Sequence, residues 1–188
     1  EEQLLDFKVF PPKNQEVGAL SVVMEVDGHS YDQEMILIEY DHIPTQTILR
    51  PATTKVVRLD IEKRGKEIGY IMGAGDAIPA SLEQIGYNVT LLEDKDMSVE
   101  KLAQYDAVIL GIRAYNTQER LKFHQDKLFK YAENGGTLIV QYNTGHRLKV
   151  DKVAPYPMEI SRDRVAVEEA EVRILKPDHV VMTSPNKI

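Results

Sequence analysis

Near its middle the chain reads Tyr105-Asp-Ala-Val-Ile-Leu-Gly-Ile-Arg-Ala-Tyr-Asn116, where a short apolar run passes directly into polar residues. A second unit of this kind, Gly135-Gly-Thr-Leu-Ile-Val-Gln-Tyr-Asn-Thr144, follows it. Short apolar runs that alternate with helical segments predict a parallel α/β sheet. Ligands of such sheets bind at the carboxyl ends of the strands, which is where these polar residues fall. The sequence therefore predicts where a binding site lies, without supplying an evident catalyst.

Residues 67–188 follow this alternating pattern from their first strand. We expect strands at 68–72, 88–92, 107–111 and 137–142. Helices are expected at about 78–85, after Ser98 as N-cap, and at about 119–133. This order is that of a doubly wound, flavodoxin-like parallel sheet. Val165 to Leu175 alternates enough to predict one more strand or a hairpin, whereas residues 178–188 receive no assignment.

Residues 1–63 have a different pattern, which predicts antiparallel β structure. Segments rich in Val, Ile, Leu and Tyr are separated by turn signals, and they run over Asp6–Phe10, Ser21–Val26, Glu34–Tyr40 and Thr53–Ile61. We interpret them as a β-sandwich, immunoglobulin-like segment that is incomplete at its N-terminus. Residues 63–66 are then a linker to an α/β domain at 67–188, and the ends of the sequence suggest a fragment truncated at its C-terminus as well.

The bulk composition excludes several classes of function. The net charge of −7 and the lack of clustered Lys and Arg argue against nucleic-acid binding and against an anionic membrane surface. No apolar stretch approaches the roughly 20 residues that span a bilayer. The chain has no Cys, which removes thiol nucleophiles, disulfides and thiolate metal sites. The compartment stays open, with a periplasmic or extracellular location as the favoured expectation.

Polar residues after three of the expected strands form the candidate ligand site. They are Asp76, Arg113, Tyr115, Asn116, Gln141 and Asn143. A structural reading competes with ligand contact: Asp76 caps a helix, Asn116 or Thr117 caps the next one, and Arg113 pairs with a carboxylate such as Asp76.

Other motifs point to chemistry less directly. Gly73-Ala-Gly-Asp76 lacks the third glycine of a dinucleotide fingerprint, because position 78 is Ile. If the chain is a hydrolase, its best candidates for a nucleophile and an adjacent base are Thr144, His146 and Asp76. The five His residues show no metal-ligand spacing, so we expect neither metal nor cofactor. Ser161-Arg-Asp-Arg164 is expected to be an exposed salt-bridge network rather than an anion site.

Several strings together resemble a known family. They are Tyr40-Asp-His-Ile-Pro44, Ile68-Gly-Tyr-Ile-Met-Gly-Ala-Gly-Asp76, Gly111-Ile-Arg-Ala-Tyr-Asn116, Gln141-Tyr-Asn-Thr144 and Ile160-Ser-Arg-Asp-Arg-Val165. The chain resembles the C-terminal region of long bacterial PIG-L (LmbE-like) deacetylase family proteins. That resemblance implies β-sandwich material, then a class I glutamine-amidotransferase-like domain, with an N-terminal zinc deacetylase domain of the same parent protein as partner.

The resemblance carries no activity into these residues. The family's His-Pro-Asp-Asp-type zinc motif has no counterpart here, and an amidotransferase requires a Cys nucleophile that the chain lacks. The leading expectation is a non-catalytic accessory module of an N-acetyl-sugar deacetylase, which binds a small polar ligand or glycan at the strand ends. The alternatives are an independent hydrolase and a purely structural or oligomerisation domain.

Overall fold

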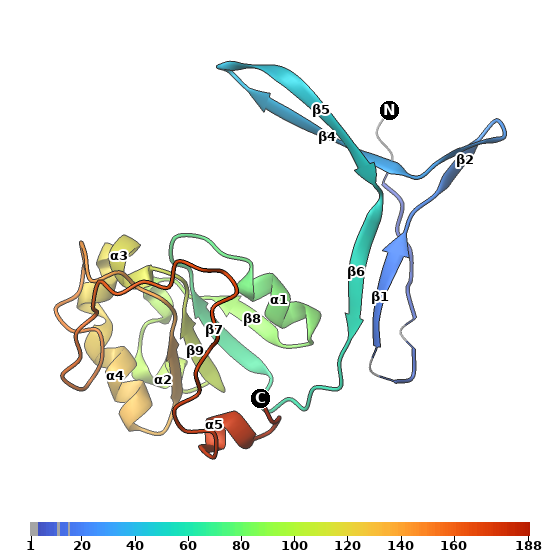
Figure 1. The fold of residues 1–188 in the computed structure, drawn as a ribbon. Coiled ribbons are helices and arrows are strands. Elements are labelled where there is room, and N and C mark those ends of the chain that lie inside the picture. The colour runs from blue at the N-terminus through green and yellow to red at the C-terminus, as the bar shows by residue number, and fades with distance from the viewer. Residues whose placement is uncertain (1–3, 11, 15) are drawn as a thin grey trace. The chain divides into compact units, whose positions relative to one another are not determined.

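The computed structural model describes residues 4–10, 12–14 and 16–188. Its contacts divide the chain into two compact units, residues 1–62 and 63–188, which are described separately (Figure 1). In the described part of the chain, no helix is long and apolar enough to cross a membrane.

The first unit consists of antiparallel β-ladders. Its strands are β1 (Glu16–Ser21), β2 (Met24–Val26), β3 (His29–Tyr31), β4 (Gln33–Tyr40), β5 (Ile43–Pro51) and β6 (Thr53–Arg58). They pair as β1 with β6, β2 with β3 and β4 with β5, each pair as a separate two-stranded sheet. The β2–β3 turn has positive φ at Asp27 and Gly28, 50° and 78°, as a tight type I′ hairpin requires.

These ladders carry exposed apolar side chains, with Val17 62%, Met35 61% and Leu49 59% exposed. Two-stranded ladders are only marginally stable without a packed face. The described residues of this unit therefore supply antiparallel strands but not two packed sheets. The strand expected at Asp6–Phe10 is not formed, because this segment pairs with no neighbour in the described unit.

The second unit alternates strands and helices around a parallel sheet. Its elements are β7 (Glu67–Ile71), α1 (Ile78–Gln84), β8 (Asn88–Leu91), η1 (Asp94–Asp96), α2 (Val99–Leu102), β9 (Ala107–Leu110), α3 (Ala114–Thr117), η2 (Glu119–Phe123), α4 (Gln125–Glu133), β10 (Thr137–Val140) and α5 (Val180–Thr183). The four strands are parallel in the order β10-β9-β7-β8. This is a mixed α/β unit with a four-stranded parallel sheet flanked by helices, compatible with a flavodoxin-like core.

Alternate residues of the central strands supply two hydrophobic cores. On one face, Ile71, Val108 and Leu110 belong to the larger core, which includes residues of α2 and α4. On the other face, Tyr70 and Ile109 belong to a smaller core, against which Leu82 of α1 packs. Sheets buried on both faces require this continuous apolar pattern in their strands.

Backbone hydrogen bonds to Asp106 fix the start of the sheet. Its carboxylate accepts from the N–H groups of Lys66 and Glu67, at 2.6 and 2.8 Å. The bond from Lys66, and then the bond from Glu67, hold the pKa of the Asp106 carboxyl below its usual value, because both stabilise the charged form.

Two expectations about helices meet different outcomes. Ser98 caps α2 as expected, since its hydroxyl accepts from the backbone N–H of Lys101 at 3.3 Å. The single helix expected over 119–133 is wrong. Residues 119–123 form a 3₁₀ helix, and α4 begins only after His124. The His124 carbonyl accepts the first α-helical hydrogen bond of α4, from the backbone N–H of Leu128.

The strand or hairpin expected at Val165–Leu175 is also wrong. No strand is formed over this segment, and Val165 and Leu175 are 81% and 83% exposed. Alternation alone does not make a strand where no partner supplies the ladder hydrogen bonds.

Candidate functional site

The carboxyl ends of β7 and β9 approach closely, and two glycines permit it. A Cβ on Gly111 would lie 2.9 Å from the Tyr70 hydroxyl, and a Cβ on Gly73 would collide with the carbonyl oxygen of Ile112. Gly75 has a φ of 102°, which a side chain rarely tolerates. The Gly73–Asp76 segment is therefore a tight β-α turn, as the structural interpretation of this motif predicts.

Asp76 and Gln141 meet at the hydroxyl of Tyr70. That hydroxyl donates to both carboxylate oxygens of Asp76, at 2.7 and 2.8 Å, and accepts from Nε2 of Gln141 at 2.9 Å. Asp76 also accepts from the backbone N–H of Ile78 at 3.0 Å, and so serves the start of α1. Burial first, and then the bond to Asp76, raise the pKa of Tyr70 far above its usual value, so the hydroxyl stays protonated.

Tyr70 is the central member of this network, and the candidate list from sequence lacks it. The sequence does contain a signal for this role: Tyr70 lies in the middle of a buried strand, and a buried hydroxyl requires a hydrogen-bond partner.

Asn143 joins the end of β10 to α3. Its Oδ1 accepts from the backbone N–H of Tyr115 at 3.0 Å, and its Nδ2 donates to the carbonyl of Gln141 at 2.8 Å. The side chain is buried, with the residue 6% exposed. Its hydrogen-bonding groups are thus used within the protein.

Asn116 holds the chain that follows β10. Its Nδ2 donates to the carbonyl oxygens of Thr144 and His146, at 3.0 and 2.9 Å, and its Oδ1 accepts from the N–H of Thr144 at 3.0 Å. The residue is 8% exposed. Asn116 therefore positions residues 144–146 rather than capping a following helix.

Tyr115 lies entirely within the larger core. Burial raises the pKa of its hydroxyl, and the Gln125 side chain opposes that effect. Because the side chain is fully buried, a ligand does not reach it in this structure.

Arg113 is the one residue of the expected set whose side chain is open to solvent. Its backbone is left-handed, with φ 57°, and its N–H donates to the carbonyl of Tyr142 at 2.7 Å. Within the described residues it forms no salt bridge, so the expected pair with Asp76 is absent. Instead, Arg113 lines a pocket.

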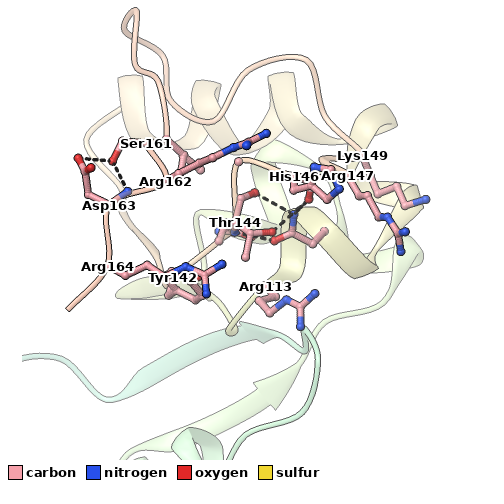
Figure 2. A pocket seen from close by; sticks show the side chains of 14 residues that line it. Arg113, Tyr142, Thr144, His146, Arg147, Lys149, Ser161, Arg162, Asp163 and Arg164 are labelled. Atoms are coloured by element: carbon pink, nitrogen blue, oxygen red, sulfur yellow. Dashed lines mark hydrogen bonds between the residues drawn. The ribbon is translucent and has the colours of Figure 1, made fainter. Parts of the chain in front are cut away.

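This pocket, of about 790 Å³, lies beyond the ends of β9 and β10 (Figure 2). One wall comes from Arg113, Asn116, residues 142–147 and Lys149, and the other from Ile160–Arg164. The two walls touch at Gly145, where an added Cβ would lie 2.7 Å from the carbonyl oxygen of Ile160. The second wall was not predicted, because no strand or helix pattern marks this segment.

The hydrolase constellation is not assembled by this geometry. The hydroxyl of Thr144 donates to the carbonyl oxygen of His146 at 3.1 Å, not to its imidazole. Asp76 is engaged by Tyr70 and backbone N–H groups, and among the described residues no hydrogen bond joins it to His146. The described part of the chain also holds no group of three His, Cys, Asp or Glu side chains suited to a metal ion.

Comparisons of the chain with protein-family models, with curated proteins and with solved structures found no match. Function must therefore be inferred from the pocket and from the hydrogen-bond network beside it. The network uses up the polar groups of the strand ends, whereas the pocket presents polar side chains that are open to a ligand.

Proposed function

We propose that the α/β unit is a non-catalytic accessory module that binds a small polar ligand, such as a glycan, in the pocket beyond β9 and β10. The observation that carries this proposal is the pocket itself. Its volume of about 790 Å³ falls within the roughly 300–1,000 Å³ of small-molecule sites. It also lies at the carboxyl edge of a parallel sheet, where such sites are usual.

The lining suits a sugar-like molecule. Tyr142 is 63% exposed and offers an aromatic face on which the apolar side of a sugar ring can pack. His146 adds an exposed imidazole. The hydroxyl oxygens of Thr144 and Ser161, whose protons are donated to the His146 carbonyl and to Asp163, add acceptors. An aromatic surface beside several polar groups is what a hydroxyl-rich ring requires.

The polar network supports a binding role over a catalytic one. A general base or nucleophile needs a free functional group within reach of the substrate. Asp76 and Gln141 are bonded to Tyr70, and Asn116 and Asn143 are bonded to the backbone. These four side chains hold the strand ends in place, so none of them is free to act as a general base or nucleophile in the pocket.

The wider context of the module is part of the same proposal. The resemblance in sequence suggests a class I glutamine-amidotransferase-like domain in a PIG-L (LmbE-like) deacetylase protein, whose deacetylase domain is its partner. The sheet order β10-β9-β7-β8 supports a flavodoxin-like arrangement. The ladders of residues 16–58, with their exposed apolar side chains, fit a β-sandwich segment that further strands cover.

Isothermal titration calorimetry on the full 188-residue chain tests the binding proposal. The ligands are glucosamine, N-acetylglucosamine, glucuronate and their short oligomers. We expect at least one to bind, and Tyr142→Ala to weaken it about tenfold or more, because stacked aromatic contact is lost. Tyr156→Ala is the matched control, since Tyr156 is 77% exposed and lies outside the pocket. Absence of binding by every sugar, or equal losses in both variants, refutes the proposal.

A structural or oligomerising role for residues 16–62 is a second candidate, favoured by the exposed apolar side chains of the ladders. Apolar surface of this extent is normally covered by a partner. Sedimentation velocity should then show concentration-dependent association of the chain. A monomer at all concentrations up to about 100 µM would remove this candidate.

A further inference from the structure

We propose that the pocket beyond β9 and β10 selects an anionic ligand, a small sugar-like molecule that carries carboxylate or phosphate groups. This inference rests on the proposed binding function and adds the charge of the ligand. Arginine and lysine side chains dominate the lining. Its described residues include five cationic side chains, Arg113, Arg147, Lys149, Arg162 and Arg164, and a single carboxylate, that of Asp163. The chain as a whole has a net charge of −7, so this concentration of positive charge is local.

The carboxylate in the pocket is turned away from the arginines. Asp163 accepts a hydrogen bond from the hydroxyl of Ser161 at 2.8 Å, and its backbone N–H donates to the same hydroxyl at 3.1 Å. Figure 2 shows both arginines extending away from Asp163, Arg162 toward His146 and Arg164 toward Tyr142. Asp163 therefore does not neutralise its neighbours, and the expected salt-bridge network in 161–164 is wrong for the described structure.

Several cations elsewhere in the same unit pair with carboxylates. Arg120 pairs with Asp94 at 3.0 Å and Lys130 with Glu133 at 2.8 Å. By contrast, none of the four arginines of the pocket makes a salt bridge within the part of the chain that the structure describes. A concave surface lined by one sign of charge raises the local concentration of ligands of the opposite sign.

The backbone conformation of two pocket arginines is an independent sign that the surrounding structure holds them in place. Arg113 and Arg147 have φ of 57° and 59°, in the left-handed region that non-glycine residues seldom adopt. Both line the pocket, one at the tip of β9 and one after β10. Left-handed residues other than glycine concentrate at ligand sites, where the surrounding structure fixes them.

The chemistry of the donors defines the class of ligand. The guanidinium group is a planar fork that matches carboxylate and phosphate oxygens in pairs. Arginines stand on both walls, Arg113 and Arg147 opposite Arg162 and Arg164, so a bound anion is contacted from two sides. With Tyr142 as an aromatic surface between them, an acidic or phosphorylated sugar satisfies the whole lining.

Calorimetry with the full chain distinguishes the outcomes. The probes are glucose, glucuronate and glucose 6-phosphate, titrated at about 20 and 500 mM NaCl. We expect an anionic sugar to bind at least about tenfold more tightly than glucose at low salt, and to lose most of that advantage at high salt. Carboxylate and phosphate are separated by comparing glucuronate with glucose 6-phosphate.

The double variant Arg162→Gln, Arg164→Gln should weaken the anionic sugar by about tenfold or more, because charge-assisted hydrogen bonds are lost. Both residues lie in an exposed segment, so the fold should persist, and circular dichroism verifies it. Lys130→Gln removes one positive charge outside the pocket and should leave the affinity unchanged.

Each other result overturns the inference. If glucose binds as tightly as the anionic sugars, the pocket does not select charge, although the proposed binding function survives. If the double variant binds normally, or Lys130→Gln weakens binding equally, the pocket arginines do not carry the selectivity. If no sugar of either kind binds, the proposed function fails together with the inference.

Discussion

Replacing Asn116 with alanine removes three hydrogen bonds to the segment that follows β10. Bonds between neutral groups contribute about 0.5–1.5 kcal/mol each, and roughly 1.5–4.5 kcal/mol for the set. His146 is exposed, so water can replace part of what is lost. We therefore expect a loss of about 2 kcal/mol in the free energy of unfolding, which lowers the melting temperature by roughly 4–8 °C in a chain of this size.

Urea denaturation followed by circular dichroism measures this change. Asn134→Ala is the matched control, because Asn134 is exposed at the end of α4. It should alter the free energy of unfolding by less than about 0.5 kcal/mol. If Asn116→Ala changes stability no more than this control, Asn116 does not hold residues 144–146 and the reasoning is refuted.

Asn116→Asp sharpens the same test through pH. At pH 7 the aspartate places a charged oxygen where Nδ2 donates to two carbonyl oxygens, so the destabilisation should exceed that of the alanine variant. Protonation restores a donor. The stability deficit relative to the parent protein at the same pH should therefore shrink between pH 7 and pH 4.5. A deficit that stays constant or grows would contradict the hydrogen-bond assignment.

Two further predictions concern the sheet. Tyr70→Phe should lower the free energy of unfolding by about 1–3 kcal/mol, because the Asp76 carboxylate loses a buried donor. The control Tyr142→Phe, at an exposed position just after the end of β10, should have little effect. Equal effects of the two variants in urea denaturation would contradict this prediction. Asp106 has a folded pKa below its unfolded value, so its contribution to stability is present above the unfolded pKa and is lost as the pH falls through the folded one. Asp106→Asn should flatten the fall in stability below about pH 4, and an unchanged acid profile would show that Asp106 contributes nothing.

The parallel sheet was predictable from sequence because most of its strands are short apolar runs bounded by a glycine, as at Gly73, Gly111 and Gly136. The strands expected at 68–72, 107–111 and 137–142 match β7, β9 and β10 to within a residue or two. The central strands β7 and β9 are buried on both faces, so their sequences are mostly apolar, whereas the outer strands β8 and β10 are largely exposed. The ladders of residues 16–58 had a weaker signal, since β1, β3 and β5 were missed and the strand at 6–10 was wrong.

The sequence predicted where the polar residues of the candidate site lie, but not which groups they bind. Strand ends gather polar residues at one edge, and Asp76, Asn116, Gln141 and Asn143 do meet there. Their partners are mostly backbone groups of other segments, which no sequence pattern identifies. The arginines of 160–164 were misread for a related reason: their place opposite Arg113 depends on the contact between Gly145 and Ile160, which is a tertiary feature.

The position of Tyr70 explains why the open pocket lies where it does. In doubly wound sheets a ligand normally enters the crevice where the strand order reverses, here between β7 and β9. The Tyr70 hydroxyl and the Asp76 carboxylate occupy that crevice, and even a methyl group on Gly111 would lie 2.9 and 3.0 Å from them. A ligand at the reversal point would have to displace these groups, whereas the pocket beyond β9 and β10 is open. The loops that line this pocket carry arginines, an aromatic ring and hydroxyl groups, and this is the chemistry on which the proposed binding function rests.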